Sequence, residues 1–143
     1  MIHKSPPENF NPKFEVVSCF LEHNGEILLL YRKEEKSEGN KWGVPAGKID
    51  DGECEFTAMA RELREETGIT AHRDDLKYLN KIYVRYPDYD FVYYMFCFQL
   101  EERPFINIRK SEHETFCWVS PNRALEMNLV SGQDMCIEMV YGS

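Results

Sequence analysis

The chain has 143 residues, a length that fits one domain able to bury its own core. Its net charge of −8 argues against a general nucleic-acid binder, which normally carries a basic face. The five cysteines include no C-x-x-C pair, so neither a disulfide framework nor a zinc knuckle is expected. No apolar stretch approaches the length of a membrane span, and the first residues lack the apolar core of a signal peptide. These features predict a cytoplasmic protein that does not enter membranes.

The first third of the chain predicts an arm, two strands and a loop. Residues 1–13 are polar and rich in proline, which predicts a flexible N-terminal arm ahead of a domain at 14–143. Residues 14–22 and 26–32 are rich in apolar side chains and predict two strands, joined by a tight turn at Asn24-Gly25. The charged stretch 33–41 and the glycine-containing stretch 42–52 follow and are expected to be loops.

The rest of the chain predicts further strands and helices. Residues 54–67 hold good helix formers and are followed by Gly68, which is typical of a left-handed C-terminal cap. The remaining predicted elements are strands at 76–86, 91–100 and 115–119, a short helix at 121–127 with Ser120 as its N-cap, and a terminal helix at 131–141. Strands mixed with helices in this way indicate an α/β fold with a sheet covered on both faces.

The predicted helix at 54–67 gathers three carboxylates on one face. At about 100° per residue, a set of mainly apolar side chains (Phe56, Ala60, Leu63 and Thr67) falls on the side that should meet the core. Glu62, Glu65 and Glu66 share another face, where like charges repel and the C-terminal end of the helix dipole disfavours anions. A bound Mg²⁺, which prefers oxygen ligands, would compensate for both costs. A solvated acidic face is the alternative.

The segment around these carboxylates resembles the Nudix box. Residues 47–69 read G-K-I-D-D-G-E-C-E-F-T-A-M-A-R-E-L-R-E-E-T-G-I, against the pattern G-x5-E-x7-R-E-U-x-E-E-x-G-U, where U is a bulky aliphatic residue. The matching positions are Gly47, Glu53, Arg61, Glu62, Leu63, Glu65, Glu66, Gly68 and Ile69. The resemblance implies an α/β/α sandwich with a mixed sheet. It also implies hydrolysis, dependent on Mg²⁺ or Mn²⁺, of a nucleoside diphosphate linked to another moiety.

The same resemblance assigns roles within the box. Glu62 and Glu66 become the principal metal ligands, Glu65 a further ligand or a catalytic base, and the carbonyl of Gly47 an additional ligand. A structural ion pair is implied between Arg61 and Glu53.

The general base can also lie outside the box. The sequence Ser111-Glu112-His113-Glu114 precedes a predicted strand, so Glu112 or Glu114 could reach the metal site, with Glu114 as the favoured candidate. The alternative is a solvated loop, in which His113 is an ordinary surface histidine.

A second group of residues is expected to bind the substrate. Arg32 and Lys48 are candidates for the phosphates, because the guanidinium fork matches phosphate geometry and both lie beside predicted strands or turns. Trp42 could stack on a base or simply pack. Tyr86 is a further candidate for binding the substrate, and it lies in a segment with several other tyrosines. Gln133 and Asp134 could bond a base edge, or cap the terminal helix.

Three hypotheses for the function remain open at this stage. The leading one is a MutT-like pyrophosphatase that converts a nucleoside or deoxynucleoside triphosphate to a monophosphate and pyrophosphate. The second is hydrolysis of ADP-ribose, a nucleotide sugar or a dinucleoside polyphosphate. The third is a non-catalytic nucleotide-sensing module. Each expects a small-molecule nucleotide as the partner and no nucleic acid polymer, and each allows a homodimer, while the base, sugar and leaving group stay open.

Overall fold

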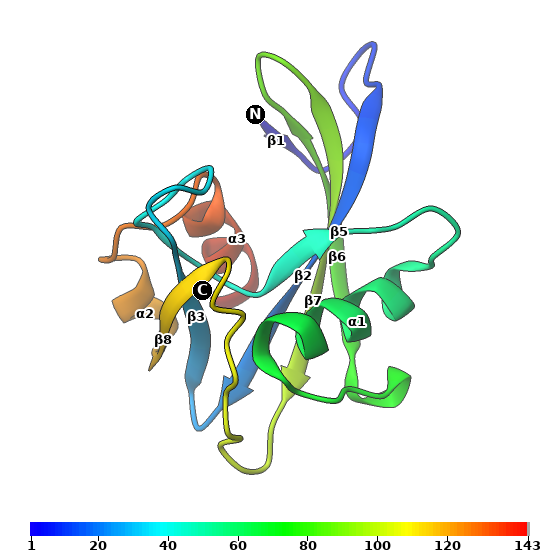
Figure 1. Cartoon of the computed structure of the whole chain (residues 1–143). Coiled ribbons are helices and arrows are strands. Elements are labelled where there is room, and N and C mark those ends of the chain that lie inside the picture. The colour runs from blue at the N-terminus through cyan, green and yellow to red at the C-terminus, as the bar shows by residue number, and fades with distance from the viewer. Residues whose placement is uncertain (143) are drawn as a thin grey trace.

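A curved mixed sheet organises the fold in the computed structural model, which describes residues 1–142 (Figure 1). Its strands are β1 (Ile2–His3), β2 (Pro12–His23), β3 (Glu26–Arg32), β4 (Trp42–Gly43), β5 (Ala46–Lys48), β6 (Lys77–Arg85), β7 (Asp90–Gln99) and β8 (His113–Val119). The helices are α1 (Glu55–Thr67), the short 3-10 helix η1 (Arg73–Asp75), α2 (Pro121–Ala124) and α3 (Gln133–Tyr141). None of these helices in residues 1–142 is both long and apolar enough to cross a membrane.

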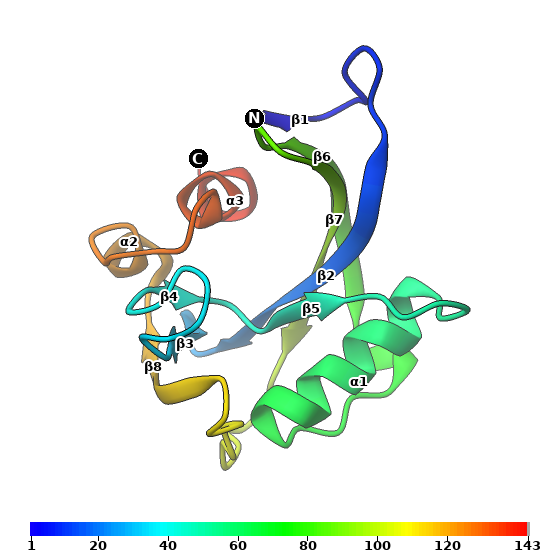
Figure 2. The same ribbon diagram turned by 45° about the horizontal axis from the view of Figure 1, so that its top comes forward.

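The long strand β2 holds the sheet together. It pairs in parallel with β7 along most of its length, while the other pairings in the sheet are antiparallel. Its opposite edge is shared, because β5 pairs with residues 16–18 of β2 and β3 pairs with residues 22–23. The main order is β1-β6-β7-β2-β3-β4, and β8 pairs with β3. This division of β2 brings β5 alongside α1 (Figure 2).

Helices cover both faces of the sheet, which confirms the predicted sandwich. The alternation of side chains along β3 sends Leu28 and Leu30 into a core shared with Met59 and Leu63 of α1. Ile27 and Leu29 enter a second core with side chains of α2 and α3, among them Ile137. The buried residues of β3 therefore serve two cores at once, as expected for a strand covered on both sides.

The local turn and cap signals are found where the sequence predicts them. Asn24 and Gly25 both have positive φ, at 50° and 78°, as a tight hairpin turn requires. Gly68 has φ of 79°, and its N–H donates to the carbonyl of Arg64 at 3.0 Å, which ends α1. Ser120 accepts a hydrogen bond from Arg123 N at 3.2 Å. The last two helices are shorter than expected, since α2 ends at Ala124 and α3 begins only after Gly132.

The N-terminal residues differ from the expected loose arm. Ile2 and His3 form β1, which pairs with β6 through Val84 and Tyr83, and β2 begins at Pro12 rather than at residue 14. The expectation rested on local composition, whereas β1 is ordered by backbone groups of β6 more than 80 residues away. The last residue of the predicted domain, Ser143, lies outside the described residues.

Candidate active site

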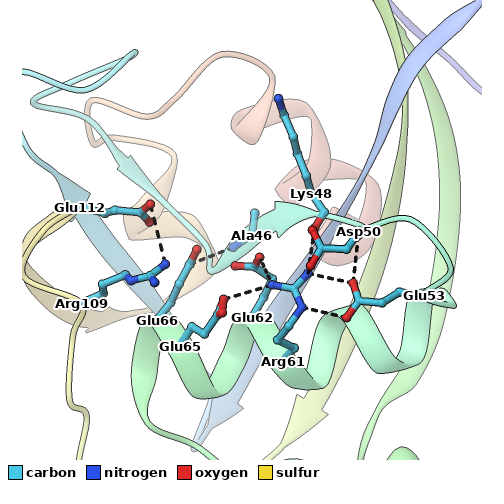
Figure 3. A network of polar contacts seen from close by, with 10 residues as sticks. All are labelled: Ala46, Lys48, Asp50, Glu53, Arg61, Glu62, Glu65, Glu66, Arg109 and Glu112. Carbon is cyan, nitrogen blue, oxygen red and sulfur yellow. Dashed lines mark hydrogen bonds and ion pairs between the residues drawn. The ribbon is translucent and has the colours of Figure 1, made fainter.

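Two buried carboxylates of α1 form the centre of the site. Glu62 and Glu66, one helical turn apart, are only 8% and 4% exposed, and both lie beneath β5 (Figure 3). Glu66 Oε1 accepts a hydrogen bond from the backbone N–H of Ala46 at 3.2 Å. The apolar face of α1 sets this position, because Met59 and Leu63 in the core fix the rotation of the helix. The helical spacing of these glutamates puts them on a shared face of α1, and β5 covers that face.

The buried pair perturbs the acid strength of both side chains. Burial, reinforced by the negative charge of Glu62, raises the pKa of Glu66 well above its ordinary value. Burial also raises the pKa of Glu62, although the neighbouring Arg61 opposes that rise. Two carboxylates held in this way favour a cation that would offset their charge.

Gly47 makes the close approach of β5 to α1 possible. A Cβ atom at position 47 would overlap the carboxylate of Glu62, so a side chain larger than hydrogen has no room there. Gly47 pairs with Val17 of β2, which holds the backbone in this place. The predicted importance of this glycine therefore has a physical reason, while its carbonyl as a metal ligand stays a prediction.

Arg61 organises the carboxylates around it, and its predicted ion pair with Glu53 is present. Arg61 Nε donates to Glu53 Oε2 at 2.8 Å and Nη2 donates to Glu53 Oε1 at 2.9 Å. The same guanidinium contacts Glu62 and Glu65 at 2.8 and 3.0 Å, and it donates to the carbonyl of Lys48 at 3.0 Å. These bonds from Arg61 lower the pKa of Glu53 to about 2. The guanidinium thus ties the loop before α1 to the helix (Figure 3).

A divalent cation such as Mg²⁺ needs several oxygen ligands around one point. Within residues 1–142, no three carboxylate, imidazole or thiol groups converge on a single point. Glu62 and Glu66 supply buried oxygen ligands next to the backbone of β5, which suits Mg²⁺ or Mn²⁺. Glu65 is turned onto Arg61 and would have to rotate to join them. The chemistry of these residues fits a divalent cation held chiefly by Glu62 and Glu66.

The loop before β8 brings another carboxylate near the pair. Glu112 forms an ion pair with Arg109 at 4.0 Å, and its charge contributes to the raised pKa of Glu66 (Figure 3). Glu114, the other candidate for the base, is exposed on β8, and neither of the two glutamates is among the described residues that line the neighbouring cavity. The two candidates differ in that Glu112 is half-buried and its charge acts on Glu66.

His113 is not the surface histidine that was expected. It is 4% exposed, lines the cavity beside the carboxylates, and has no hydrogen-bond partner for Nδ1 within residues 1–142. Burial, together with the positive charge of Arg32, lowers its pKa to about 4. The expectation was wrong because β8 continues to residue 113 and pairs it with Arg32 of β3.

A cavity of about 260 Å³ opens beside Glu66. Its lining includes Glu66, Arg32 and His113 and is otherwise largely made of aromatic and aliphatic side chains. The aromatic residues are Phe14, Tyr86, Tyr89, Phe91 and Tyr93. Such a mixture of apolar walls and a few polar groups is typical of a binding site for a small organic molecule.

The predicted substrate residues divide into two groups. Arg32 and Tyr86 line the cavity, and Lys48 lies over the ring of Phe14, a cavity residue, with its Nζ 4.3 Å from the ring centroid. Trp42 instead packs on Tyr31 at 4.8 Å. Asp134 is exposed, and its carboxylate accepts a bond from Met135 N at 2.9 Å. Neither of these two is among the cavity-lining residues of the described chain.

Gln133, beside Asp134, is the residue of α3 that reaches the cavity. Its Oε1 accepts a hydrogen bond from Val44 N at 3.1 Å, which fixes the orientation of the amide. Its Nε2 is buried and has no partner anywhere in the part of the chain that the structure describes. The sequence leaves both Gln133 and Asp134 as candidates. The start of α3 at Gln133 decides which of them faces inward.

Comparison with known proteins gives the same picture. The family model of the NUDIX domain matches residues 12–138. The chain is 29% identical over 127 residues to a CTP pyrophosphohydrolase of Escherichia coli K12, covering 80% of this chain and 82% of the relative.

Two solved structures share the fold at lower sequence identity. A MutT Nudix hydrolase from Burkholderia pseudomallei has a TM-score of 0.77 at 24% identity, covering 91% of this chain and 98% of that one. A bifunctional NMN adenylyltransferase/ADP ribose pyrophosphatase from Francisella tularensis, complexed with AMP and a manganese ion, has a TM-score of 0.73 at 23% identity. That likeness covers 92% of this chain and 42% of the larger protein. The chain belongs to the Nudix family, as a hydrolase that acts on pyrophosphate bonds.

Proposed function

We propose that the protein hydrolyses a nucleoside or deoxynucleoside triphosphate to a monophosphate and pyrophosphate. The observation that carries this proposal is the junction of two features at Glu66, which belongs to the buried carboxylate pair and also lines the aromatic cavity. A base bound in the cavity would direct its phosphates toward Glu62 and Glu66. A volume of about 260 Å³ suits one base rather than two joined nucleotides.

Glu62 and Glu66 are the side chains proposed to hold Mg²⁺ or Mn²⁺. Such an ion neutralises phosphate oxygens and lowers the pKa of a bound water. Support comes from the burial of two neighbouring carboxylates and from the glycine at position 47, which lets the backbone approach them. The carbonyl of Gly47 and the carboxylate of Glu65 are further proposed ligands.

Two cations of the chain are proposed to bind the phosphates. Arg32 lines the cavity near Glu66, and its Nε donates to the carbonyl of Ser37 at 2.8 Å, which orients the guanidinium. Lys48 is the last residue of β5, the strand that carries Gly47, and its side chain points away from α1 (Figure 3). An arginine and a lysine in these positions would keep the substrate anion close while the metal offsets the charge of Glu62 and Glu66.

The far wall of the cavity is proposed to recognise the base. Tyr86 and Phe91 offer aromatic surface for stacking, and the unpartnered Nε2 of Gln133 is a donor for a carbonyl or ring nitrogen. Glu38 is a cavity residue as well. Burial acts to raise its pKa, but hydrogen bonds from Ser131 and the charge of Lys41 outweigh burial, and the pKa is lowered. An ionised Glu38 accepts a hydrogen bond from an amino group of a base.

Glu112 is proposed as the group that accepts the proton of the attacking water. It is the glutamate outside the box whose charge is felt by Glu66, and Arg109 lies beside it in the same loop. Glu65 is engaged by Arg61, and Glu114 is exposed on β8. A carboxylate base has to lie within reach of the water, directly or through one further water, and Glu112 meets that requirement best.

The reaction is tested by incubating the protein with the eight common ribo- and deoxyribonucleoside triphosphates, ADP-ribose, UDP-glucose and diadenosine tetraphosphate, in the presence of Mg²⁺. Phosphorus NMR identifies the products, and hydrolysis in ¹⁸O-water shows which phosphorus is attacked. We expect label transfer together with release of pyrophosphate from at least one triphosphate. Release of monophosphate from none of the triphosphates would contradict the proposal.

Matched variants separate chemistry from folding. Glu66→Gln should reduce turnover to near the background rate, whereas Glu126→Gln, at an exposed position just after α2, should leave turnover unchanged. Equal rates in the wild type and the Glu66→Gln variant, with nucleotide still bound, would instead favour a sensing module.

ADP-ribose is the second candidate substrate. The solved relative with an ADP ribose pyrophosphatase activity in its name shares the fold, and its AMP is a fragment of ADP-ribose. The CTP pyrophosphohydrolase, which matches over most of its own length, favours a triphosphate. Hydrolysis of ADP-ribose without hydrolysis of any triphosphate would decide for the second candidate.

A further inference from the structure

The first eleven residues lie outside the segment that the family model matches. The NUDIX match begins at residue 12, whereas the structure shows residues 1–11 folded back onto the sheet (Figure 2). We call this segment the N-terminal strap. Its strand β1 extends the edge of the sheet beyond β6, at the end of the sheet far from α1.

The strap is fastened at several points to the hairpin of β6 and β7. The backbone N–H of Arg85 donates to the carbonyl of Met1 at 2.7 Å, and its Nη1 donates to the carbonyl of Glu8 at 3.0 Å. Arg85 is itself held by Asp90 through two hydrogen bonds of 2.9 and 3.0 Å, and Asp90 also accepts a bond from Asn11 N at 2.9 Å. The ion pair therefore anchors the strap at Glu8 and Asn11, while the backbone of Arg85 holds its first residue.

The fastened strap presents Ile2 to the cavity. Ile2 lines the cavity with Ile82 and Val84 of β6, and it packs in the same core as Ile137 of α3. Its Cδ1 would lie 3.3 Å from a Cβ placed on Gly132, the residue that precedes α3. Ile2 thus spans the space between the edge of the sheet and the start of the last helix.

Ile2 is separated from the carboxylates by several strands of the sheet. It pairs with Val84 of β6, Val84 pairs with Phe91 of β7, and Phe91 pairs with Phe14 of β2, whereas Ala46, which bonds Glu66, pairs with Ser18 four residues further along β2. The strand β1 lies at the edge of the curved sheet away from β5 and α1 (Figure 2). A nucleotide with its phosphates at Glu66 has its sugar next and its base beyond. Because the exocyclic amino group of adenine or cytosine lies opposite the bond to the sugar, that edge of the base points toward Ile2.

We propose that the N-terminal strap sets the size of base that the enzyme accepts, with Ile2 as the closing wall. This inference rests on the proposed function, since it takes the cavity as the base-binding site. The wall admits an unsubstituted amino group and excludes a bulky substituent on it. Arg85 acts as a positioning residue, because it holds the strap without being among the described residues that line the cavity.

The test compares ATP with N6-benzyl-ATP, and CTP with N4-benzyl-CTP, as substrates of the wild type and of Ile2→Ala. We expect the wild type to discriminate against the benzyl compounds. In Ile2→Ala, the ratio of kcat/KM for a benzyl compound to that for its parent should rise roughly tenfold or more, the size of effect that a few carbons in an apolar pocket produce. The change should reside mainly in KM, because the phosphates and their ligands are untouched.

Two further variants make the result specific. Arg85→Leu should shift the same ratio in the same direction by a smaller amount, because it removes the bond to the carbonyl of Glu8 and the partner of Asp90 while leaving the backbone pairing of β1 and the cavity lining intact. His3→Ala changes the neighbouring residue of β1, which is outside the set of cavity-lining residues within 1–142, and should leave the ratio unchanged. Thermal unfolding of each variant checks that the fold persists.

The outcomes separate the two proposals. If the wild type hydrolyses neither ATP nor CTP nor their benzyl derivatives, and dialysis detects no binding of AMP or CMP, the base-binding cavity and this inference fall together. If the wild type is active but the ratio is the same in Ile2→Ala, the inference alone is overturned. An equal shift in His3→Ala would also overturn it, because the effect would then be a general loosening of the edge.

Discussion

Gly47 and Glu62 are related by a steric constraint, because a Cβ atom on Gly47 would occupy the space of the Glu62 carboxylate. Position 47 belongs to β5 and position 62 to α1, so the constraint joins the sheet to the helix at the centre of the site. The absence of a side chain at one residue thus determines where the acidic group of another can lie.

The first prediction concerns the variant Gly47→Ala. The added methyl group must push Glu62 or β5 aside, so we expect turnover to fall sharply, with a loss of about 1–3 kcal/mol in the free energy of unfolding. Steady-state kinetics and urea unfolding measure the two effects. Gly52→Ala is the matched control, because Gly52 has φ of 82° but no atom within 4 Å of an added Cβ. Its backbone strain should reduce stability without a comparable loss of turnover.

A second prediction concerns removal of the metal. Binding of Mg²⁺ to the folded protein should raise Tm, and an excess of chelator should reverse the rise and stop turnover. Glu66→Gln should weaken the metal-induced rise in Tm. In chelator the same variant should be at least as stable as the wild type, because it removes one of two neighbouring buried acids. A metal-induced rise of equal size in the variant would show that Glu66 is not a ligand.

The third prediction distinguishes the candidates for the general base. Glu112→Gln should lower kcat by roughly 100-fold or more, the contribution expected of a general base, and should change KM little. Glu114→Gln should behave as the wild type, because Glu114 is exposed on β8. Single-turnover measurements at saturating Mg²⁺ isolate the chemical step. A slow Glu114→Gln enzyme beside a normal Glu112→Gln enzyme would reverse the assignment.

A fourth prediction concerns the dependence of stability on pH. The pKa of His113 is lowered to about 4 by burial and by Arg32, so the folded protein holds this imidazole neutral while the unfolded chain protonates it near 6.5. Between these two values the unfolded chain binds more protons than the folded protein. The free energy of unfolding therefore has its full value above pH 6.5 and falls progressively as the pH falls toward 4. Urea unfolding at several pH values should show a shallower decline in this window for His113→Gln. The exposed His72→Gln variant should follow the wild type.

The sequence predicts the chemistry of this protein better than the shape of its cavity. Residues 54–68 carry their own signals, since the periodicity of apolar residues and a C-terminal glycine define α1 and the shared face of Glu62 and Glu66. The position of Gly47 next to that face is implied by the family resemblance, and the structure adds the steric reason.

The less accurate expectations all depend on partners distant in the sequence. His113 was expected at the surface because its neighbours are polar, yet its pairing with Arg32 of β3 buries it. Of the two polar residues considered at the start of α3, Gln133 lines the cavity and Asp134 is exposed, because the exact start of the helix decides which side chain faces inward. β1 depends on hydrogen bonds to β6. Local patterns carry no information about such contacts.

The parallel pairing of β2 with β7 also bears on how the chain folds. The paired residues are separated by more than 70 positions, and no hairpin can join parallel strands, so the loss of chain entropy on closing this long loop comes before the pairing is formed. β2, β5 and α1 are closer in sequence and can associate earlier. During synthesis the acidic centre would therefore be assembled on the ribosome before β7 has emerged, and the pocket beside it would close last.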